Sequence, residues 1–361
     1  MRVTFVLPVV PPLAGGIKVV FRYSNELARR GHTVSIVFPA QMATLPPDEW
    51  LGLKSRLRMV KHAFLRWRQG HPVEWFDLDP QVRFLELPNL QDHYLPEADI
   101  LIATSWHTAR WVNAASLRRG LKFYFIQHYE AVMGPNAEVD ATWKMPLRKI
   151  VIASWLKELS EQKFGEPIYD LVVNGVDLAE FYNEHKIYHS PQRIGMMYHT
   201  AEWKGIPDGI RAFELARAKH PDIRLVMFGV YPPEIPLADY MKFHLKPYGE
   251  SLRQLYCSFN IFLSPSWTEG NQAPPMEAMA CQCAVVATNV GGIPDYTLPG
   301  ETALVSPPKE PERLAENLVT LLDDPAKLER ISQAGYHKIR EFSWENATRK
   351  IIAAFERALR E

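Results

Sequence analysis

Two carboxylates in the second half of the chain, Glu269 and Glu277, have a spacing and a setting that sugar or nucleotide chemistry could use. They lie in the stretch SPSWTEGNQAPPMEAMACQCAVVATNVGGIPD, residues 264–295, where an expected strand leads into a loop that holds Glu269. Pro274–Pro275 then predicts the start of a helix with Glu277 in its first turn. Such a helix start presents unpaired N–H groups to a phosphate, and a carboxylate held there can accept two hydrogen bonds from a vicinal diol. The alternative is that Glu277 only complements the helix dipole.

The elements that must position these residues follow a βαβ rhythm, in which short runs rich in Val, Ile and Phe alternate with longer amphipathic segments. Helices are expected at 17–30, 108–117, 155–164, 205–218, 251–257, 275–280, 311–322 and 326–342. Strands are expected at 3–9, 34–38, 100–103, 123–126, 150–153 and 171–173, and, beyond a polar connection at 181–192, at 193–197, 225–229, 261–264, 284–287 and 303–305. The pattern predicts an α/β fold with two doubly wound parallel-sheet domains, residues 1–178 and 190–342, that face each other across a cleft. Ligands of such sheets bind beyond the carboxyl ends of the strands, so the chemistry is expected there.

Composition argues against several other classes of protein. The 361 residues carry 41 Lys+Arg and 41 Asp+Glu, so no overall positive field favours nucleic acid. Three cysteines, with Cys281 and Cys283 too close for a CxxC knuckle, argue against a disulfide framework or a zinc site and fit a reducing compartment. No apolar stretch reaches the roughly 18 residues of a membrane span, and the first residues read as a strand, not as a signal peptide. A cytoplasmic, two-domain protein is therefore expected.

The stretch around the two glutamates resembles the family 4 retaining glycosyltransferases of the GT-B fold. The resemblance is carried by the Glu-x7-Glu motif at Glu269 and Glu277, the EAMA helix and the sequence VGGIPD. It extends to the glycines that follow the first strand, the residues before the connection and the start of the second domain's first helix: Gly15–Gly16, Asn174–Asp177 and Lys204–Gly205. The closing segment 343–361 is similar to the family's final helix, which packs back on the first domain. The resemblance implies two Rossmann-like domains, the first binding the acceptor and the second the donor.

The resemblance also implies roles for the matched positions. Glu277 would bind the ribose hydroxyls of a nucleotide, Glu269 the hydroxyls of the transferred sugar, and Lys204 the diphosphate. Gly15 and Gly16 would let backbone N–H groups approach a phosphate or the acceptor, because a side chain would block that approach. The structural alternatives are a solvated lysine at a helix start and a plain glycine turn. This turn lacks GxGxxG spacing, which argues against a dinucleotide-binding dehydrogenase.

Position also favours His128, which follows the expected strand at 123–126 and falls where the family places an active-site histidine beside the donor sugar. His107, after the strand at 100–103, is the competing candidate. Glu130, two residues beyond His128, is expected either to orient the histidine or to meet the acceptor. A lone histidine is more often structural, but a place at the carboxyl end of a strand favours a functional role.

Two positions depart from the family's pattern. Members commonly carry an arginine five or six residues before the diphosphate lysine, where this chain has Tyr198 and His199. Without a guanidinium, bidentate phosphate recognition is lost, and a protonated His199 is one replacement. Asn271–Gln272 stands where Phe-Gly is usual, which predicts an altered sugar pocket. The expected catalytic residues are His128, Glu269 and Lys204, and the expected donor-binding residues are Gly15, Gly16, His199, Gly270, Asn271, Gln272 and Glu277.

Together these observations predict a retaining, metal-independent glycosyltransferase that moves a sugar from a nucleotide diphosphate sugar to a carbohydrate or a lipid-linked glycan. The nucleotide sugar is a co-substrate, and no cofactor is expected. Two alternatives remain: a degenerate nucleotide-sugar-binding scaffold, to which the lost arginine points, and a GT-B-like nucleotide-sugar epimerase. The basic amphipathic stretch Trp50–Arg68 suits peripheral contact with an anionic membrane or, as the commoner case, docking on its own domain.

Overall fold

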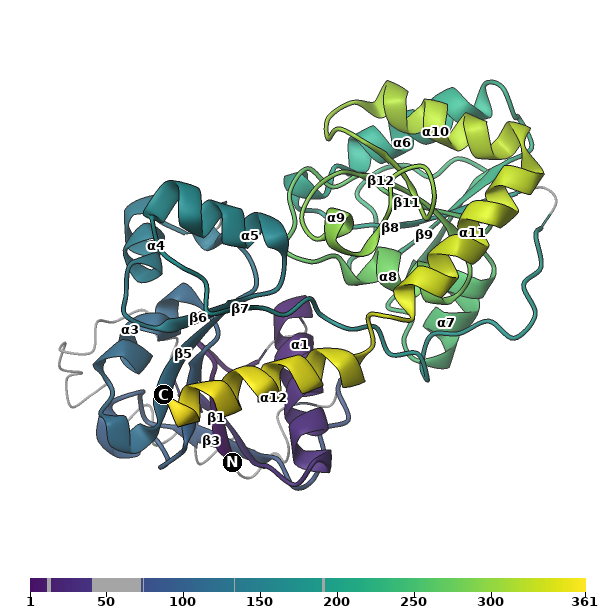
Figure 1. Ribbon diagram of the computed structural model, residues 1–361. Coiled ribbons are helices and arrows are strands. Elements are labelled where there is room, and N and C mark those ends of the chain that lie inside the picture. Colours follow the sequence, from purple (N-terminus) through teal and green to yellow (C-terminus); the bar gives the residue numbers. More distant parts are fainter. Residues whose placement is uncertain (12–13, 41–72, 74, 133, 190–191) are drawn as a thin grey trace. The chain divides into compact units, whose positions relative to one another are not determined.

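The computed structural model describes residues 1–11, 14–40, 73, 75–132, 134–189 and 192–361 (Figure 1). The chain divides into two compact units: unit 1 is Met1–Asn174 with Trp344–Glu361, and unit 2 is Gly175–Ser343. Each unit is built on its own parallel sheet, so the expected α/β class with two parallel-sheet domains is confirmed. The stretch Trp50–Arg68 lies outside the described residues, and the membrane contact assigned to it stays a prediction.

Unit 1 contains a sheet of seven parallel strands among its described residues. In chain order they are β1 (Arg2–Val6), β2 (Thr33–Pro39), β3 (Arg83–Leu87), β4 (Ile100–Ala103), β5 (Leu121–Ile126), β6 (Arg148–Val151) and β7 (Asp170–Leu171). Their order across the sheet is β3-β2-β1-β4-β5-β6-β7, with Val3 of β1 beside Val34 of β2 and Ile100 of β4. The central strands β1, β2 and β4 are almost wholly buried, which explains their continuous apolar runs.

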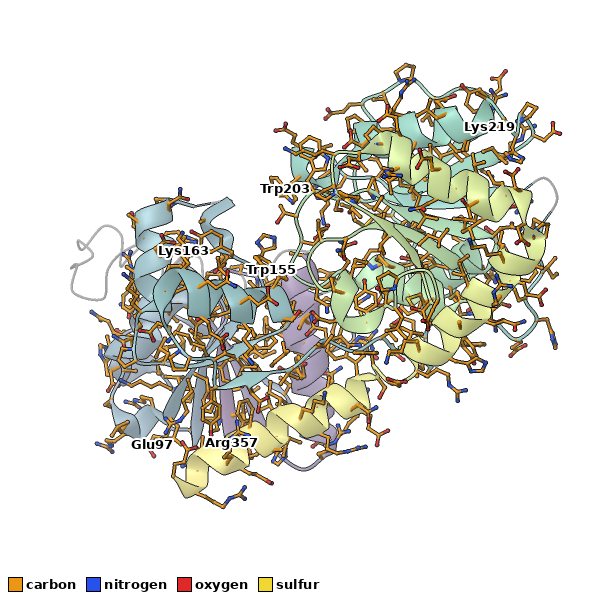
Figure 2. The ribbon with its side chains drawn as sticks, turned by 45° about the horizontal axis from the view of Figure 1, so that its top comes forward. Glu97, Trp155, Lys163, Trp203, Lys219 and Arg357 are labelled. Carbon is orange, nitrogen blue, oxygen red and sulfur yellow. The ribbon has the colours of Figure 1, made fainter. Side chains whose placement is uncertain are left out.

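Helices accompany this sheet, as parallel pairing requires crossover connections. They are α1 (Gly15–Arg29), α3 (Trp106–Ala114), α4 (Asn136–Trp143), α5 (Ser154–Leu159), which continues as a π-helix η4 (Ser160–Phe164), and α12 (Trp344–Arg360). The last of them, α12, packs against α1 (Figure 1), and the rings of Tyr23 and Trp344 lie 5.2 Å apart at this contact. At its other end Arg357 donates to Asp170 of β7 at 2.9 Å (Figure 2). The end of the chain therefore completes unit 1.

Unit 2 contains a sheet of six parallel strands. In chain order they are β8 (Arg193–Met197), β9 (Arg224–Gly229), β10 (Met241–Leu245), β11 (Ile261–Ser264), β12 (Ala284–Thr288) and β13 (Leu304–Ser306). Their order across the sheet is β10-β9-β8-β11-β12-β13. The chain runs outward in one direction from β8 and in the other from β11, so the switch point of this doubly wound sheet lies between these two neighbours. Ligands of such sheets bind beyond the carboxyl ends of the strands at that point.

The helices of unit 2 alternate with its strands. They are the 3-10 helix η5 (Glu202–Lys204), α6 (Ile206–Arg217), α7 (Glu250–Cys257), α8 (Ala273–Ala280), α9 (Ile293–Tyr296), α10 (Pro311–Asp323) and α11 (Pro325–Ile339). Among the described residues, no helix has the length and apolar character that crossing a bilayer requires.

Two strands were not predicted, β3 and β10, and both lie at a sheet edge. Their sequences, RFLEL and MKFHL, mix apolar and charged side chains, and their residues are exposed or only partly buried. An edge strand has only one neighbouring strand, and its other side is exposed to solvent. Its side chains can therefore alternate between apolar and charged, whereas the buried central strands are continuous apolar runs. The helices α4 and α9 were also missed, because each is short and lacks a clear apolar period.

Candidate functional site

The loops that follow β8 and β11 bring together Lys204 and Glu269, two residues to which the family resemblance gave roles at the donor site. Lys204 ends the short helix after β8, and Glu269 lies in the loop after β11. Lys204 Nζ donates to Glu269 Oε1 at 2.6 Å, and their side chains are only 19% and 13% exposed. Ser266 Oγ donates to the same oxygen at 2.9 Å. An ammonium carries three N–H donors, so this lysine can hold the glutamate and still bind an anion.

The glycine after Lys204 is required because the two loops touch at this point. Gly205 has a φ of +61°, and a Cβ added there would lie 2.1 Å from the carbonyl oxygen of Pro265. One residue before the lysine, the carbonyl oxygen of Trp203 (Figure 2) accepts a hydrogen bond from the N–H of Trp267 at 2.7 Å. The Lys204–Gly205 pair that carried part of the resemblance therefore fixes the loop after β8 against the loop after β11.

Glu277 lies on α8, but not in its first turn as expected. The helix begins at Ala273, two residues before the predicted start, which makes Glu277 its fifth residue. Its Oε2 accepts a hydrogen bond of 2.8 Å from the hydroxyl of Tyr256, a fully buried residue of α7. Nothing in the sequence had singled out Tyr256. The buried phenol fixes one oxygen of a carboxylate that is itself only partly buried.

The start of α8 offers a phosphate fewer donors than a helix start usually does. Pro274 and Pro275 are its second and third residues, and proline has no N–H. These positions are among the four whose N–H groups lack a partner within a helix. The expected phosphate site at this helix start is therefore reduced to the N–H groups of the cap and of Ala273, and the charge of Lys204 becomes more important.

The loop that holds Glu269 packs against the glycine pair of VGGIPD. Gly291 has a φ of +60°, and a Cβ added there would lie 2.8 Å from both Cβ and the carbonyl oxygen of Glu269. At Gly292 an added Cβ would lie 2.6 Å from Nδ2 of Asn271. Gly270, between these two loop residues, is buried. In the sequence, VGGIPD indicated only a resemblance, and no role was predicted for these glycines.

We expect Gly291→Ala to destabilise unit 2 by about 2–4 kcal/mol, because it combines a left-handed backbone with overpacking against Glu269. Gly300→Ala is the matched control: its φ is +80°, but no atom lies within 4 Å of an added Cβ, so about 1 kcal/mol is expected. Urea unfolding followed by fluorescence measures both. Equal losses of stability in the two variants would contradict the close packing of this loop.

Gln272 does not strain the loop, although glycine is usual at the matching position of the family that the sequence resembles. Its φ of −84° and ψ of 111° are open to any residue. The side chain is 3% exposed, and its Oε1 accepts from Ser264 Oγ at 2.7 Å, at the end of β11. Its Nε2 is buried without a hydrogen-bond partner among the described residues. The Gln272 side chain is thus held inside unit 2 by the hydrogen bond that its Oε1 accepts from Ser264.

His199 is not suited to replace the missing arginine as a cation. Burial, with the nearby charge of Lys204, lowers the pKa of His199 below its ordinary value of 6.5. Its Nδ1 accepts from the N–H of Ala201 at 2.9 Å, which leaves Nε2 to carry the proton of the neutral ring. Tyr198 is buried and its hydroxyl accepts from the N–H of Glu234. The protonated replacement expected from the sequence is therefore unfavourable, and His199 can offer one neutral donor.

The expected residues of unit 1 lie at the carboxyl edge of its own sheet. Gly15 and Gly16 form the first two positions of α1, not a turn before it, so their N–H groups have no partner within the helix. Gln127, directly after β5, donates from Nε2 to the carbonyl oxygen of Gly16 at 3.1 Å. His128 follows, with Nδ1 3.0 Å from the carbonyl oxygen of Tyr129 and its ring edge-on to Trp155 (Figure 2). A carbonyl oxygen only accepts, so Nδ1 carries the proton.

Glu130 neither orients His128 nor lies free for an acceptor. Its Oε2 accepts from the N–H of Trp106, the first residue of α3, at 2.7 Å and from the hydroxyl of Tyr124 at 3.3 Å. It therefore caps α3, a role that sequence spacing did not reveal because the helix starts 24 residues earlier. His107, the competing histidine, is the second residue of α3, and its ring is tilted by 31° against that of Trp106, with the centroids 3.8 Å apart.

Burial raises the pKa of Glu130 from 4.5 to about 7, although its hydrogen bonds to Trp106 and Tyr124 oppose the shift. A carboxyl whose pKa is raised by folding binds its proton more tightly in the folded state. Stability should therefore fall as the pH rises from 4.5 to about 7, by about 3 kcal/mol, and stay level above that. In Glu130→Gln, which keeps an acceptor for Trp106, this decline should disappear. Urea unfolding at pH 5 and pH 8 tests it, and parallel pH profiles in both proteins would contradict it.

Residues 192–324 match the family described as glycosyl transferases group 1, and they include Lys204, Glu269 and Glu277. O-antigen chain mannosyltransferase B of Escherichia coli is 33% identical over 107 residues. That match covers 30% of this chain and 28% of the relative, so the chain spans less than a third of that relative's length.

Solved structures are similar to the whole chain. Sucrose-phosphate synthase from Thermosynechococcus elongatus gives a TM-score of 0.71 over 99% of both chains at 16% identity. HepE of Anabaena, solved in complex with UDP, gives 0.72 over 99% of this chain and 100% of that one at 15% identity. At such identities the likeness establishes the fold, and the expected GT-B fold is confirmed.

Proposed function

We propose that the chain is a retaining, metal-independent glycosyltransferase of family 4, which transfers a sugar from a nucleotide diphosphate sugar to a glycan or a lipid-linked glycan. The observation that carries the proposal is the Lys204–Glu269 pair at the switch point of β8 and β11, within the residues that match the group 1 family. Unit 2 would bind the donor, and unit 1 the acceptor.

The leaving group is a nucleoside diphosphate, and Lys204 is the cation of this site placed to stabilise its developing charge. One of its donors holds Glu269, and the other two can meet phosphate oxygens. The neutral Nε2–H of His199 and the N–H groups of Gln272 and Ala273 at the start of α8 can add hydrogen bonds. A fixed ammonium in a partly buried site stabilises the transition state without the cost of reorganisation.

The two glutamates would then divide the recognition of the donor. Glu277, fixed through one oxygen by Tyr256, accepts from the ribose diol, and Glu269 accepts from hydroxyls of the transferred sugar. In a retaining reaction by front-face attack, the acceptor oxygen forms the new glycosidic bond as the bond to the diphosphate breaks. The acceptor's proton passes to the departing phosphate oxygen. His128 of unit 1, which carries its proton on Nδ1, would contact a sugar hydroxyl.

A second function is a scaffold that binds a nucleotide sugar without catalysis. It is favoured by the small number of groups in this site that could bind a diphosphate. The positions that hold an arginine in the family carry a buried tyrosine and a histidine with a lowered pKa, Tyr198 and His199. The prolines of α8 remove two more donors. Binding without turnover would be the result if Lys204 alone stabilises the leaving group too little.

A panel of UDP-, GDP-, ADP- and dTDP-sugars tests these functions, beginning with UDP-sugars because HepE, which is similar in fold, was solved with UDP. Calorimetry measures binding, and release of the nucleoside diphosphate in the presence of glycan and lipid-linked acceptors measures transfer. Acceptor-dependent release with retained anomeric configuration supports the transferase. Binding without release supports the scaffold, conversion of the donor without acceptor supports an epimerase, and the absence of any binding rejects the proposal.

A further inference from the structure

A cavity of about 490 Å³ lies in unit 2 under α7, between that helix and the strands β8, β9 and β10. Its size lies within the range of about 300–1,000 Å³ typical of small-molecule sites. Four basic side chains line it: Arg193, Arg224, Lys242 and His244. The cavity is formed by residues of unit 2 alone.

Strand register explains why these four side chains meet. Arg193 of β8 pairs directly with Arg224 of β9, and Lys242 and His244 of β10 pair with Val226 and Phe228 of β9. Paired residues, and residues two apart along a strand, point to the same face of a sheet. All four basic residues therefore lie on one face. It is the face covered by α7, because the same β9 side chains, Val226 and Phe228, pack with Leu255 and Tyr256 of that helix.

Asp239 can offset at most one of the three positive charges of Arg193, Arg224 and Lys242 in this cavity. Among the described residues, Arg193, Arg224 and Lys242 form no ion pair, although Asp239 also lines the cavity. On α7 the carboxylate of Glu250 is held by Arg253 of the same helix. Burial and the charge of Lys242 lower the pKa of His244, as expected of a group in a positive field. Two arginines paired directly across neighbouring strands repel each other, so the arrangement costs stability unless an anion lies between them.

The two arginines of the cavity lie at the opposite end of the strands from Lys204. Arg193 and Arg224 begin their strands, whereas Lys204 and His199 follow the carboxyl end of β8. Five residues of strand, at about 3.3 Å each, separate the two edges by roughly 15 Å. A ligand of this cavity therefore occupies a site separate from that proposed for the nucleotide sugar.

We propose that this cavity binds a small phosphorylated compound carrying two or more negative charges, such as a diphosphate or a sugar phosphate. Neighbouring strands lie about 4.8 Å apart, so the guanidinium groups of Arg193 and Arg224 can reach one phosphate together, each through two parallel hydrogen bonds. Lys242, on the next strand but one from β8, supplies a third charge for a second phosphate or for the remaining oxygens. Inorganic pyrophosphate, whose charge near pH 7.5 matches three cations, is the simplest probe.

The test is calorimetric titration of pyrophosphate into the full chain, with four variants. Arg193→Gln/Arg224→Gln should weaken binding at least tenfold. Arg330→Gln, an exposed arginine of α11 without an ion pair in the described part of the chain, is the matched control and should bind as the wild type does. Lys204→Ala should retain this binding, because the two sites are separate. Lys242→Gln, on an exposed edge strand, should weaken pyrophosphate binding at least threefold. This variant replaces the double variant as the test if the double variant does not fold.

Melting temperature provides a second readout that separates binding from folding. Without pyrophosphate the double variant should melt no lower than the wild type, because the substitution removes a repulsive pair. Pyrophosphate should raise the melting temperature of the wild type and of Lys204→Ala clearly more than that of the double variant, in which the site at Lys204 is still present. No binding to the wild type, equal binding to wild type and double variant, or binding lost only in Lys204→Ala would each overturn the proposal. The last result would leave the proposed nucleotide site intact.

Discussion

Replacing Lys204 with alanine should lower kcat/KM for sugar transfer by about two to three orders of magnitude, the range seen when one preorganised charge-stabilising group is removed from a transition state. The expectation follows from the position of the lysine at the switch point of the sheet, with Glu269 fixing its Nζ at 2.6 Å. Most of the loss should fall on kcat, because charge on the diphosphate grows as the glycosidic bond breaks. Steady-state kinetics with the donor identified by the binding panel measures it.

Two further variants give this experiment its controls. Lys219→Ala removes an exposed lysine of the same unit, labelled in Figure 2, and should leave kcat/KM unchanged. Glu269→Gln combined with Lys204→Ala tests coupling, because the single lysine variant leaves a 13% exposed carboxylate facing the phosphate. The double variant should lose much less than the sum of the two single losses. If Lys204→Ala transfers sugar at the rate of Lys219→Ala, Lys204 does not stabilise the leaving group.

The pattern of buried parallel strands was strong enough to place Glu269 in the loop after a strand, whereas Lys204 was chosen through the family resemblance. Lys204 and Glu269 each follow an apolar run, and parallel strands place such positions at one edge of the sheet. The edge strands β3 and β10 lack that signal, because one neighbour and a solvent-facing side permit alternation of apolar and charged residues. The basic cavity depends on the register of β10 with β9, so it could not be foreseen without that strand.

Contacts between residues far apart in the chain were beyond what local patterns can predict. Tyr256 reaches Glu277 from another helix, and Glu130 caps a helix that begins 24 residues before it. The assignment of Gly15 and Gly16 to a turn failed for a different reason. Glycine is common in turns, and only the backbone reveals that the helix begins with these two residues. Patterns of single segments thus indicated which residues to examine, while packing decided what each one touches.

Glu277→Gln should weaken nucleotide binding by about 10–100-fold, because a carboxylate that accepts two hydrogen bonds from a ribose diol contributes roughly 1.5–3 kcal/mol. Tyr256→Phe should weaken it less, by about three- to tenfold, since it removes only the hydrogen bond of 2.8 Å that fixes Oε2. Glu301→Gln, an exposed carboxylate of the same unit, is the matched control and should bind as the wild type does. Calorimetry with the best nucleoside diphosphate measures all three.

A 2′,3′-dideoxynucleoside diphosphate lacks both ribose hydroxyls but keeps the charge of the diphosphate. It therefore distinguishes hydrogen bonding of Glu277 to the ribose from an effect of the Glu277 charge on the diphosphate. The wild type should bind this analogue about as weakly as Glu277→Gln binds the normal nucleotide. Glu277→Gln should then bind the dideoxy analogue only slightly more weakly than it binds the normal nucleotide. The reason is that the hydrogen bonds between the carboxylate and the ribose can be lost only once. A carboxylate that acted only through the dipole of α8 would repel both nucleotides equally, and its neutralisation would strengthen binding to both. The two models therefore predict opposite signs, and the sign alone decides between the functional and the structural role of Glu277.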